Sequence, residues 1–183
     1  YGTKASRVLN RVDLLTARDD LKESYGFPMP VGIDIFVLDN LPDDETMRKE
    51  LKEAVQICAM AFNLRQEINS KSIINDDYFE KIRIFHKVVD AIEQLCSIKF
   101  SCEMPGEQEI LILLDEIQSM YRDEECRELT QMDCYATTNY SIDKDCYSSV
   151  IMMPFENIMV PVPKGYEEIL RKEYGEDYMT PKN

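Results

Sequence analysis

An aspartate inside a short apolar segment is the residue of this sequence best suited to chemistry. The segment from Val31 to Leu38 is rich in β-branched and apolar residues, which predicts a β-strand. Side chains alternate along a strand, so Asp34 shares one face with Phe36 and Leu38. A carboxylate among apolar neighbours is costly unless it has a partner. Three kinds of partner are open: a metal ion, hydrogen bonds from a nearby loop, or an arginine.

Two further charged residues stand where a chain usually turns. Asp39 ends the same segment, directly before Asn40-Leu41-Pro42, and this position predicts a turn-capping carboxylate. Lys164 lies between a proline and a glycine near the end of the chain. From such a loop it could reach a phosphate group, or it could simply face solvent.

The cysteines and the histidine do not form a metal-binding pattern. None of the six cysteines is separated from another by the short spacing of a zinc site, and His86 is the only histidine. Cys58 and Cys96 fall on apolar helical positions, where we expect buried free thiols. Reduced thiols indicate a cytoplasmic protein, and His86 is expected to pack beside its helix.

The charge of the chain excludes one class of partner. Its formal net charge is −14, from 21 basic and 35 acidic side chains. A nucleic-acid-binding protein needs a basic face for the phosphates, so we expect no nucleic-acid partner. Residues 1–22 form a locally basic segment, which could meet a phosphate-bearing substrate or an anionic membrane surface, or be the solvated face of a helix predicted over residues 7–21. No apolar run approaches the ~18 residues of a membrane span.

Helices dominate the middle of the chain, and strands flank them. Apolar stripes at helical spacing predict three long helices between Asp43 and about Tyr121, the second starting at Asp77 with a capping box. Its expected buried stripe is Phe79, Ile82, Phe85, Val89, Ile92 and Cys96. The segment 123–144 is acidic and turn-rich. Strands follow over residues 147–153 and 158–162, and a last helix over residues 165–173. This order predicts an α+β fold.

Two distant segments carry a family resemblance. The first is Gly32-Ile-Asp-Ile-Phe-Val-Leu-Asp39. The second runs from Phe155-Glu156 through the Val160-Pro-Val-Pro-Lys-Gly stretch to Tyr-Gly-Glu-Asp-Tyr-Met179. In this order they resemble the LicD family of phosphotransferases, which are relatives of fukutin and fukutin-related protein. The resemblance covers most of the chain from about Gly32 onward, and its specific motifs lie at the two ends.

The family's most diagnostic motif has no counterpart in these 183 residues. That motif is a D-D-D-I-D cluster after a glycine turn, upstream of the I-D-I-F segment. We therefore expect a single LicD-like domain over residues 1–183 that lacks its N-terminal catalytic segment. An intact form would be an active phosphotransferase, and these residues alone would be inactive.

The resemblance implies a fold, a reaction and a set of site residues. The fold would be a small mixed sheet of the nucleotidyltransferase type with a large helical insertion. Asp34, with Asp39 as a second ligand, would help to bind Mg²⁺ or Mn²⁺, while Lys164 and Glu156 would contact or orient the substrate. The metal would neutralise charge during in-line transfer, without a covalent enzyme intermediate.

The implied substrates place the reaction at a membrane. A phosphorylated small alcohol, such as phosphocholine, would pass from a cytidine-diphosphate donor to a glycan or glycolipid acceptor. The acceptor would be a precursor of lipopolysaccharide, teichoic acid or capsule, which predicts a cytoplasmic protein associated peripherally with the inner face of the membrane. The alternative is a non-catalytic helical module for interaction or substrate recognition, favoured by the acidic surface and the missing motif.

Overall fold

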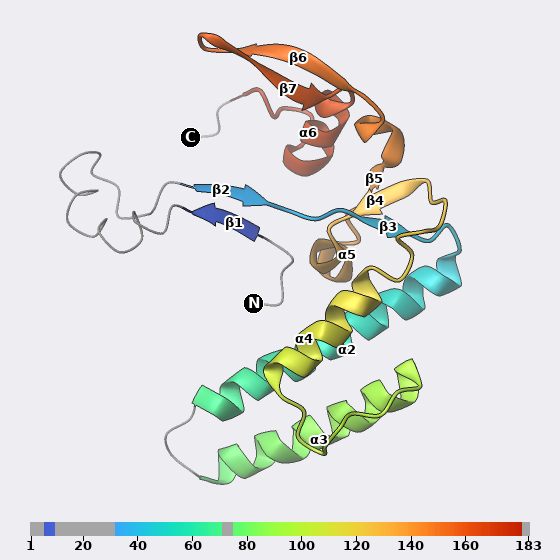
Figure 1. The fold of residues 1–183 in the computed structure, drawn as a ribbon, viewed down its shortest axis with the longest axis vertical. Helices are drawn as coiled ribbons and strands as arrows, with labels where there is room; N and C mark the ends of the chain where they lie inside the picture. Colours follow the sequence, from blue (N-terminus) through green and yellow to red (C-terminus); the bar gives the residue numbers. More distant parts are fainter. Residues whose placement is uncertain (1–5, 10–31, 71–74, 181–183) are drawn as a thin grey trace, which may run out of the picture. The chain divides into compact units, whose positions relative to one another are not determined.

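The computed structural model describes residues 6–9, 32–70 and 75–180 of the chain, and the side chains of residues 35–70 and 75–180 (Figure 1). The chain divides into two compact units, Thr3–Val37 and Leu38–Asn183.

The smaller unit contains one antiparallel strand pair. Strand β1 (Ser6–Leu9) pairs with β2 (Gly32–Ile35), so that Ser6 is opposite Ile35 and Leu9 is opposite Gly32. The helix predicted over residues 7–21 is therefore wrong at its start, because strand pairing decides over a modest helical periodicity. The rest of that predicted helix lies outside the described residues. The predicted strand over residues 31–38 is confirmed only for β2.

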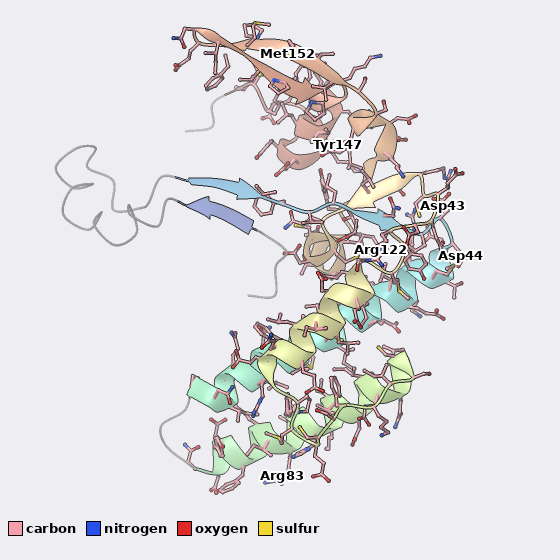
Figure 2. All side chains as sticks on the ribbon, in the orientation of Figure 1. Asp43, Asp44, Arg83, Arg122, Tyr147 and Met152 are labelled. Atoms are coloured by element: carbon pink, nitrogen blue, oxygen red, sulfur yellow. The ribbon has the colours of Figure 1, made fainter. Side chains whose placement is uncertain are left out.

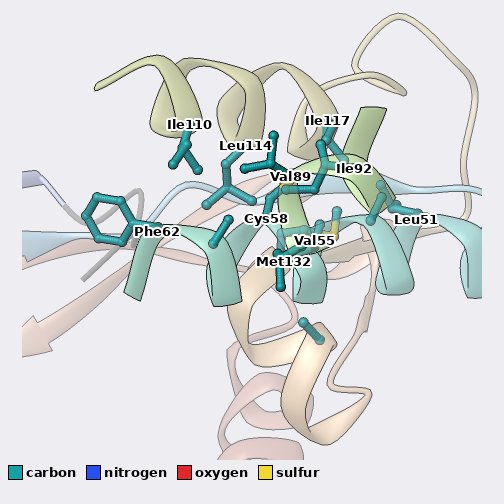
Figure 3. Close-up of a cluster of buried hydrophobic side chains, with 14 of the residues drawn as sticks. Leu51, Val55, Cys58, Phe62, Val89, Ile92, Ile110, Leu114, Ile117 and Met132 are labelled. Carbon is teal, nitrogen blue, oxygen red and sulfur yellow. The ribbon is translucent and has the colours of Figure 1, made fainter. Parts of the chain in front are cut away.

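Three long helices form the core of the larger unit, as the apolar stripes predict. Helix α2 (Glu45–Ser70) packs against both α3 (Asp76–Cys96) and α4 (Glu107–Gln118). The buried side chains shown in Figure 3 come from all three helices and from the later helix α5. The buried residues of α2 are Leu51, Ala54, Val55, Cys58, Ala61, Phe62 and Ile68.

Side-chain caps explain where α2 and α3 begin. The Asp44 Oδ1 accepts hydrogen bonds from the backbone N–H groups of Thr46 and Met47, at 2.9 and 3.0 Å. Asn75 caps α3 by accepting from the N–H of Tyr78 at 3.0 Å, so this helix begins one residue before the predicted Asp77. Phe79 is 53% exposed, which contradicts its predicted burial, because it lies in the first turn of α3.

A small antiparallel sheet precedes and follows the helical core in sequence. Its strands are β3 (Asp39–Leu41), β4 (Glu128–Thr130) and β5 (Ile142–Asp143), with β4 in the centre. Between β4 and β5 lies α5 (Met132–Thr138), which the turn-rich composition of this segment does not predict. Helix α5 contacts α2 and contributes Met132, Tyr135 and Ala136 to the core.

A hairpin and a helix end the larger unit. The 3₁₀-helix η1 (Lys144–Tyr147) leads into strand β6 (Val150–Phe155), which pairs with β7 (Ile158–Pro163). Helix α6 (Tyr166–Tyr174) follows and contacts η1. The predicted strands and last helix are confirmed with shifts of one to three residues at their ends.

The fold class is α+β, as predicted. The described residues contain five α-helices, and all of their strand pairs are antiparallel, whereas the prediction was one small mixed sheet. Within the described part of the chain, no helix has the length and apolar character needed to cross a membrane.

Candidate functional site

Asp34 lies on strand β2, the type of element predicted for it. Its Cα partner across the strand pair is Arg7 of β1. The side chains of both residues lie outside the described residues. A metal ion and an arginine thus both stay open as its partner.

Asp39 begins strand β3 and is 8% exposed. Its Cα partner is Thr130 of β4, which is fully buried. Asp39 takes part in an interaction within the protein. Asp39 lies inside a ladder, not in the turn that follows it, and a buried carboxylate in this position must be satisfied by its surroundings.

Asn40 ties the strand to the loop after α4. Its Nδ2 donates to the backbone carbonyls of Tyr121, Arg122 and Glu124, at distances of 3.0, 3.1 and 3.0 Å. These carbonyls belong to the loop that follows α4, and the amide holds that loop against β3. Sequence reasoning missed this role; the only signal was an asparagine between two buried strand positions.

Two arginines and two carboxylates close the corner between β3, α2 and β4. The side chains of Asp43 and Asp44 lie at the start of α2 (Figure 2). Arg48 contacts Glu128 at 2.7 Å and donates from Nε to the carbonyl of Pro42 at 2.5 Å. Arg127 contacts the Asp43 carboxylate at 3.1 Å. Asp43 and Glu128 each have an arginine partner, while the Asp44 carboxylate caps α2.

These contacts shift the acidity of the two carboxylates. A hydrogen bond from the backbone N–H of Arg127 lowers the pKa of Asp43, and the charges of Arg127 and Arg48 act in the same direction. A hydrogen bond from the Ser141 hydroxyl, at 2.7 Å, lowers the pKa of Glu128, and Arg48 adds to this shift. Both groups are therefore held as anions, as structural ion pairs require. Sequence reasoning did not predict this corner.

The two substrate-contact candidates on the hairpin lie at its opposite ends. Glu156 is at the turn between β6 and β7, and Lys164 follows the last residue of β7. Five residue steps of strand separate those ends, which is roughly 17 Å. Both side chains are exposed. The structure thus does not bring Glu156 and Lys164 together at one site.

Gly165 fixes the base of the hairpin against η1. Its N–H donates to the carbonyl of Cys146 at 3.0 Å, and Lys164 donates in the same way to Ser149 at 2.9 Å. A Cβ atom at position 165 would lie 2.5 Å from the Cα of Cys146, so a side chain cannot be accommodated there. The Lys-Gly pair of the second motif thus has a structural reason for its glycine.

The thiols of the core are unsuited to nucleophilic or metal chemistry. Burial raises the pKa of Cys58 to about 12, and Cys96 nearby adds to the shift. Burial also raises the pKa of the half-buried Cys96. The thiolate is the reactive form, so these groups are inert at neutral pH. The prediction of buried free thiols is confirmed for Cys58.

The described residues contain no cluster of three histidine, cysteine, aspartate or glutamate side chains that could hold a metal ion. Asp34 lies outside that set, because its side chain is not described. Asp39 is the one predicted ligand whose surroundings are known.

Searches against protein-family models, curated proteins and solved structures found no match to this chain.

Proposed function

We propose that the protein is a metal-dependent phosphotransferase of the LicD type, which moves a phosphorylated small alcohol from a cytidine-diphosphate donor to a cell-surface glycan precursor. The proposal rests on two sequence segments with I-D-I-F and P-V-P-K-G character, in the order typical of that family. Its sheet would be of the nucleotidyltransferase type.

The observation that carries the proposal is that motif residues occupy positions that restrict residue type. In the second segment, the Gly165 position has no room for a Cβ, and Gly175 ends α6 at a φ of 94°. A left-handed φ favours glycine. A family motif consists of positions at which the fold restricts the residue type. Such restricted positions support reading the segment as a motif and not as a chance match.

The metal ion would supply charge neutralisation at the donor diphosphate. From this chain, Asp34 would hold it, with Asp39 as the second ligand that the resemblance implies. The described residues do not form a complete metal site. Lys164 would bind a phosphate oxygen from its exposed position at the base of the hairpin.

A donor-turnover assay tests the proposal. The protein, as its gene encodes it, is incubated with CDP-choline, a glycan acceptor and Mg²⁺, and the release of CMP is measured by chromatography. We expect release that requires both metal and acceptor. Asp34→Asn should lower the rate by about 100-fold or more, because a metal ligand contributes several kcal/mol to the transition state.

Asp123→Asn is the matched control. The Asp123 side chain is 92% exposed and makes only a 3.5 Å contact with the neighbouring Arg122. This variant should keep full activity. Turnover that is unchanged in Asp34→Asn, or that does not need a divalent metal, would contradict the proposal.

A second candidate function is a non-catalytic interaction module. The observation that favours it is an apolar groove between α2 and α3, lined by Ile57, Met60, Ile84, Val88 and Ala91 with Glu53, Gln56 and Lys87 around them. Met60 is 52% and Ile84 40% exposed. The same assay separates the two candidates, since an interaction module would release no CMP under any condition.

A further inference from the structure

The β6–β7 hairpin is almost free of charge in a strongly acidic protein. From Val150 to Pro163, Glu156 is the only charged residue and Asn157 the only other polar one. Five large apolar side chains of the strands are more than half exposed: Val150 at 63%, Met152 at 55%, Phe155 at 60%, Ile158 at 55% and Met159 at 54%. Figure 2 shows Met152 on this hairpin. Exposed apolar side chains gathered in one element indicate a contact surface.

Three of the five exposed large side chains belong to one face, and Phe155 with its partner Ile158, beside the turn, belongs to the other. The Lys164 N–H donates to the Ser149 carbonyl, so these two residues form a hydrogen-bonded pair. Hydrogen-bonded and non-hydrogen-bonded pairs alternate along an antiparallel ladder, so the next pair, Val150 with Pro163, is non-hydrogen-bonded. Alternate pairs then share one face, which we call the outer face. Its residues are Val150, Met152, Pro154, Met159, Pro161 and Pro163.

The opposite face of the hairpin is covered except beside the turn, where Phe155 and Ile158 are exposed. Ile151, Met153, Val160 and Val162 alternate with the outer-face residues, and all four are half-buried. Apart from the half-buried Pro163 at its base, the outer face therefore has no cover among the described residues of its unit, although it consists of apolar side chains alone. A two-stranded hairpin is marginally stable by itself, so a second layer on this face would stabilise it.

Prolines prevent a partner from adding to the edge of the hairpin. At non-hydrogen-bonded pairs, the backbone N–H and C=O groups point away from the partner strand. Pro161 and Pro163 occupy two of the three such positions on β7, and Pro154 occupies one on β6. Proline has no N–H to donate, so strand addition is blocked along most of the β7 edge. A partner must approach the outer face itself.

We propose that the outer face is the contact surface between two copies of this chain, packed hairpin on hairpin. Copies that each carry a net charge of −14 repel one another, so a self-contact is favoured at a surface without charge. The acidic chain also disfavours the alternative of an anionic membrane surface. In a twofold contact the same apolar residues meet from both sides.

The size of the face sets the expected strength. Three exposed large side chains and three prolines make on the order of 500 Å² per copy, or about 1,000 Å² in total, which is the low end of specific interfaces. We therefore expect a weak dimer that forms in the micromolar range or above. Added salt should strengthen it, because salt screens the repulsion between the acidic copies and leaves apolar contacts intact.

Sedimentation velocity of the whole chain, at concentrations from low micromolar to submillimolar and at two salt concentrations, tests the proposal. Met152→Glu should abolish the concentration-dependent dimer, and Val150→Glu should do the same. Both side chains are more than half exposed, so both variants should fold, which circular dichroism would verify. Met60→Glu is the matched control, because Met60 is equally exposed but lies in the groove between α2 and α3.

Loss of the dimer in both hairpin variants, with Met60→Glu unchanged, would support the proposal. A chain that stays monomeric at every concentration would overturn it. So would a dimer that Met60→Glu abolishes and the hairpin variants do not, since the groove would then be the contact. Flotation of a monomeric chain with phosphatidylcholine vesicles, lost in Met152→Glu, would show that lipid covers the face instead.

Discussion

Glu128 has the best-defined carboxylate environment among the described residues. It accepts a hydrogen bond from Ser141 and pairs with Arg48, whose side chain is only 13% exposed. Because an arginine at this depth needs its partner, the pair is costly to break from one side. This corner holds β4 to the start of α2, and it is structural, although it is rich in the charged residues that suggest a site.

Ser141→Ala should make stability less dependent on pH. The pKa of Glu128 is lowered in the folded state, first by the Ser141 hydroxyl, so its contribution is present above the unfolded pKa of ~4.3 and lost as pH falls through the folded pKa. The variant should lose about 1 kcal/mol at pH 7. The difference from wild type should shrink below about pH 4.

Urea unfolding between pH 7 and pH 3 measures this difference, with Ser149→Ala as the control. Ser149 is exposed and uses its backbone carbonyl, not its hydroxyl, in the contact with Lys164. A Ser141→Ala penalty that stays constant down to pH 3 would show that the hydroxyl does not act through Glu128.

At the scale of elements, Gly165 joins α6 to η1 through a close contact with Cys146. Gly165→Ala should separate α6 from η1, because the new methyl group would lie 2.5 Å from backbone that cannot move aside easily. Cys146 is 5% exposed and should then react faster with a thiol reagent such as DTNB. The melting temperature should also fall.

Gly106→Ala is the control for this substitution. Gly106 precedes α4 at a φ of −74°, and a Cβ there would meet nothing within 4 Å. In Gly106→Ala, the reactivity of Cys146 and the melting temperature should match those of wild type. Equal reactivity of Cys146 in the Gly165 variant would mean that η1 does not depend on this contact.

The turn of the hairpin has a strained residue. Glu156 has a φ of 50°, and Asn157 does not have a positive φ, which is the pattern of a type II′ turn that favours glycine at its first position. Glu156→Gly should leave the hairpin as stable or slightly more stable, whereas Glu156→Val should cost about 1–2 kcal/mol. Hydrogen exchange of the hairpin amides measures both. Equal protection in the two variants would contradict a strained turn.

Periodicity predicted the elements that bury one continuous face, and missed those held by side-chain contacts. The stripes on α2 and α4 were recognisable because an amphipathic helix repeats its apolar positions. Helix α5 is seven residues long, too short for such a repeat. Strand β4 has three residues and depends on pairing with β3 and β5.

The candidate site was predictable only as single residues. Asp34 was identified from its apolar neighbours and Asp39 from its position before a turn, but Asp39 is buried in a ladder formed with a strand about ninety residues away. Glu156 and Lys164 are close in sequence, yet a hairpin places them at opposite ends. Sequence spacing does not reveal such distances, because they follow from the register.

At the scale of the whole molecule, the core belongs to one of the two units. Every buried hydrophobic side chain among the described residues lies between Leu41 and Cys146, within the unit Leu38–Asn183. The main cluster joins α2, α3, α4 and α5. A unit with its own core is expected to fold by itself.

A chain that starts at Leu38 should therefore keep its helical circular dichroism and unfold in one cooperative transition, within a few degrees of the full chain. The matched control is a chain that ends at Gln131. It lacks α5, which buries Met132, Tyr135 and Ala136 in the core. Losing two large buried side chains costs about 1.5–3 kcal/mol each, a large part of the ~5–15 kcal/mol that stabilises a domain. The control should melt far lower or not fold. If the Leu38 form lost its cooperative transition while the Gln131 form kept it, the residues before Leu38 would be part of the stabilising core, and the helices would not be its centre.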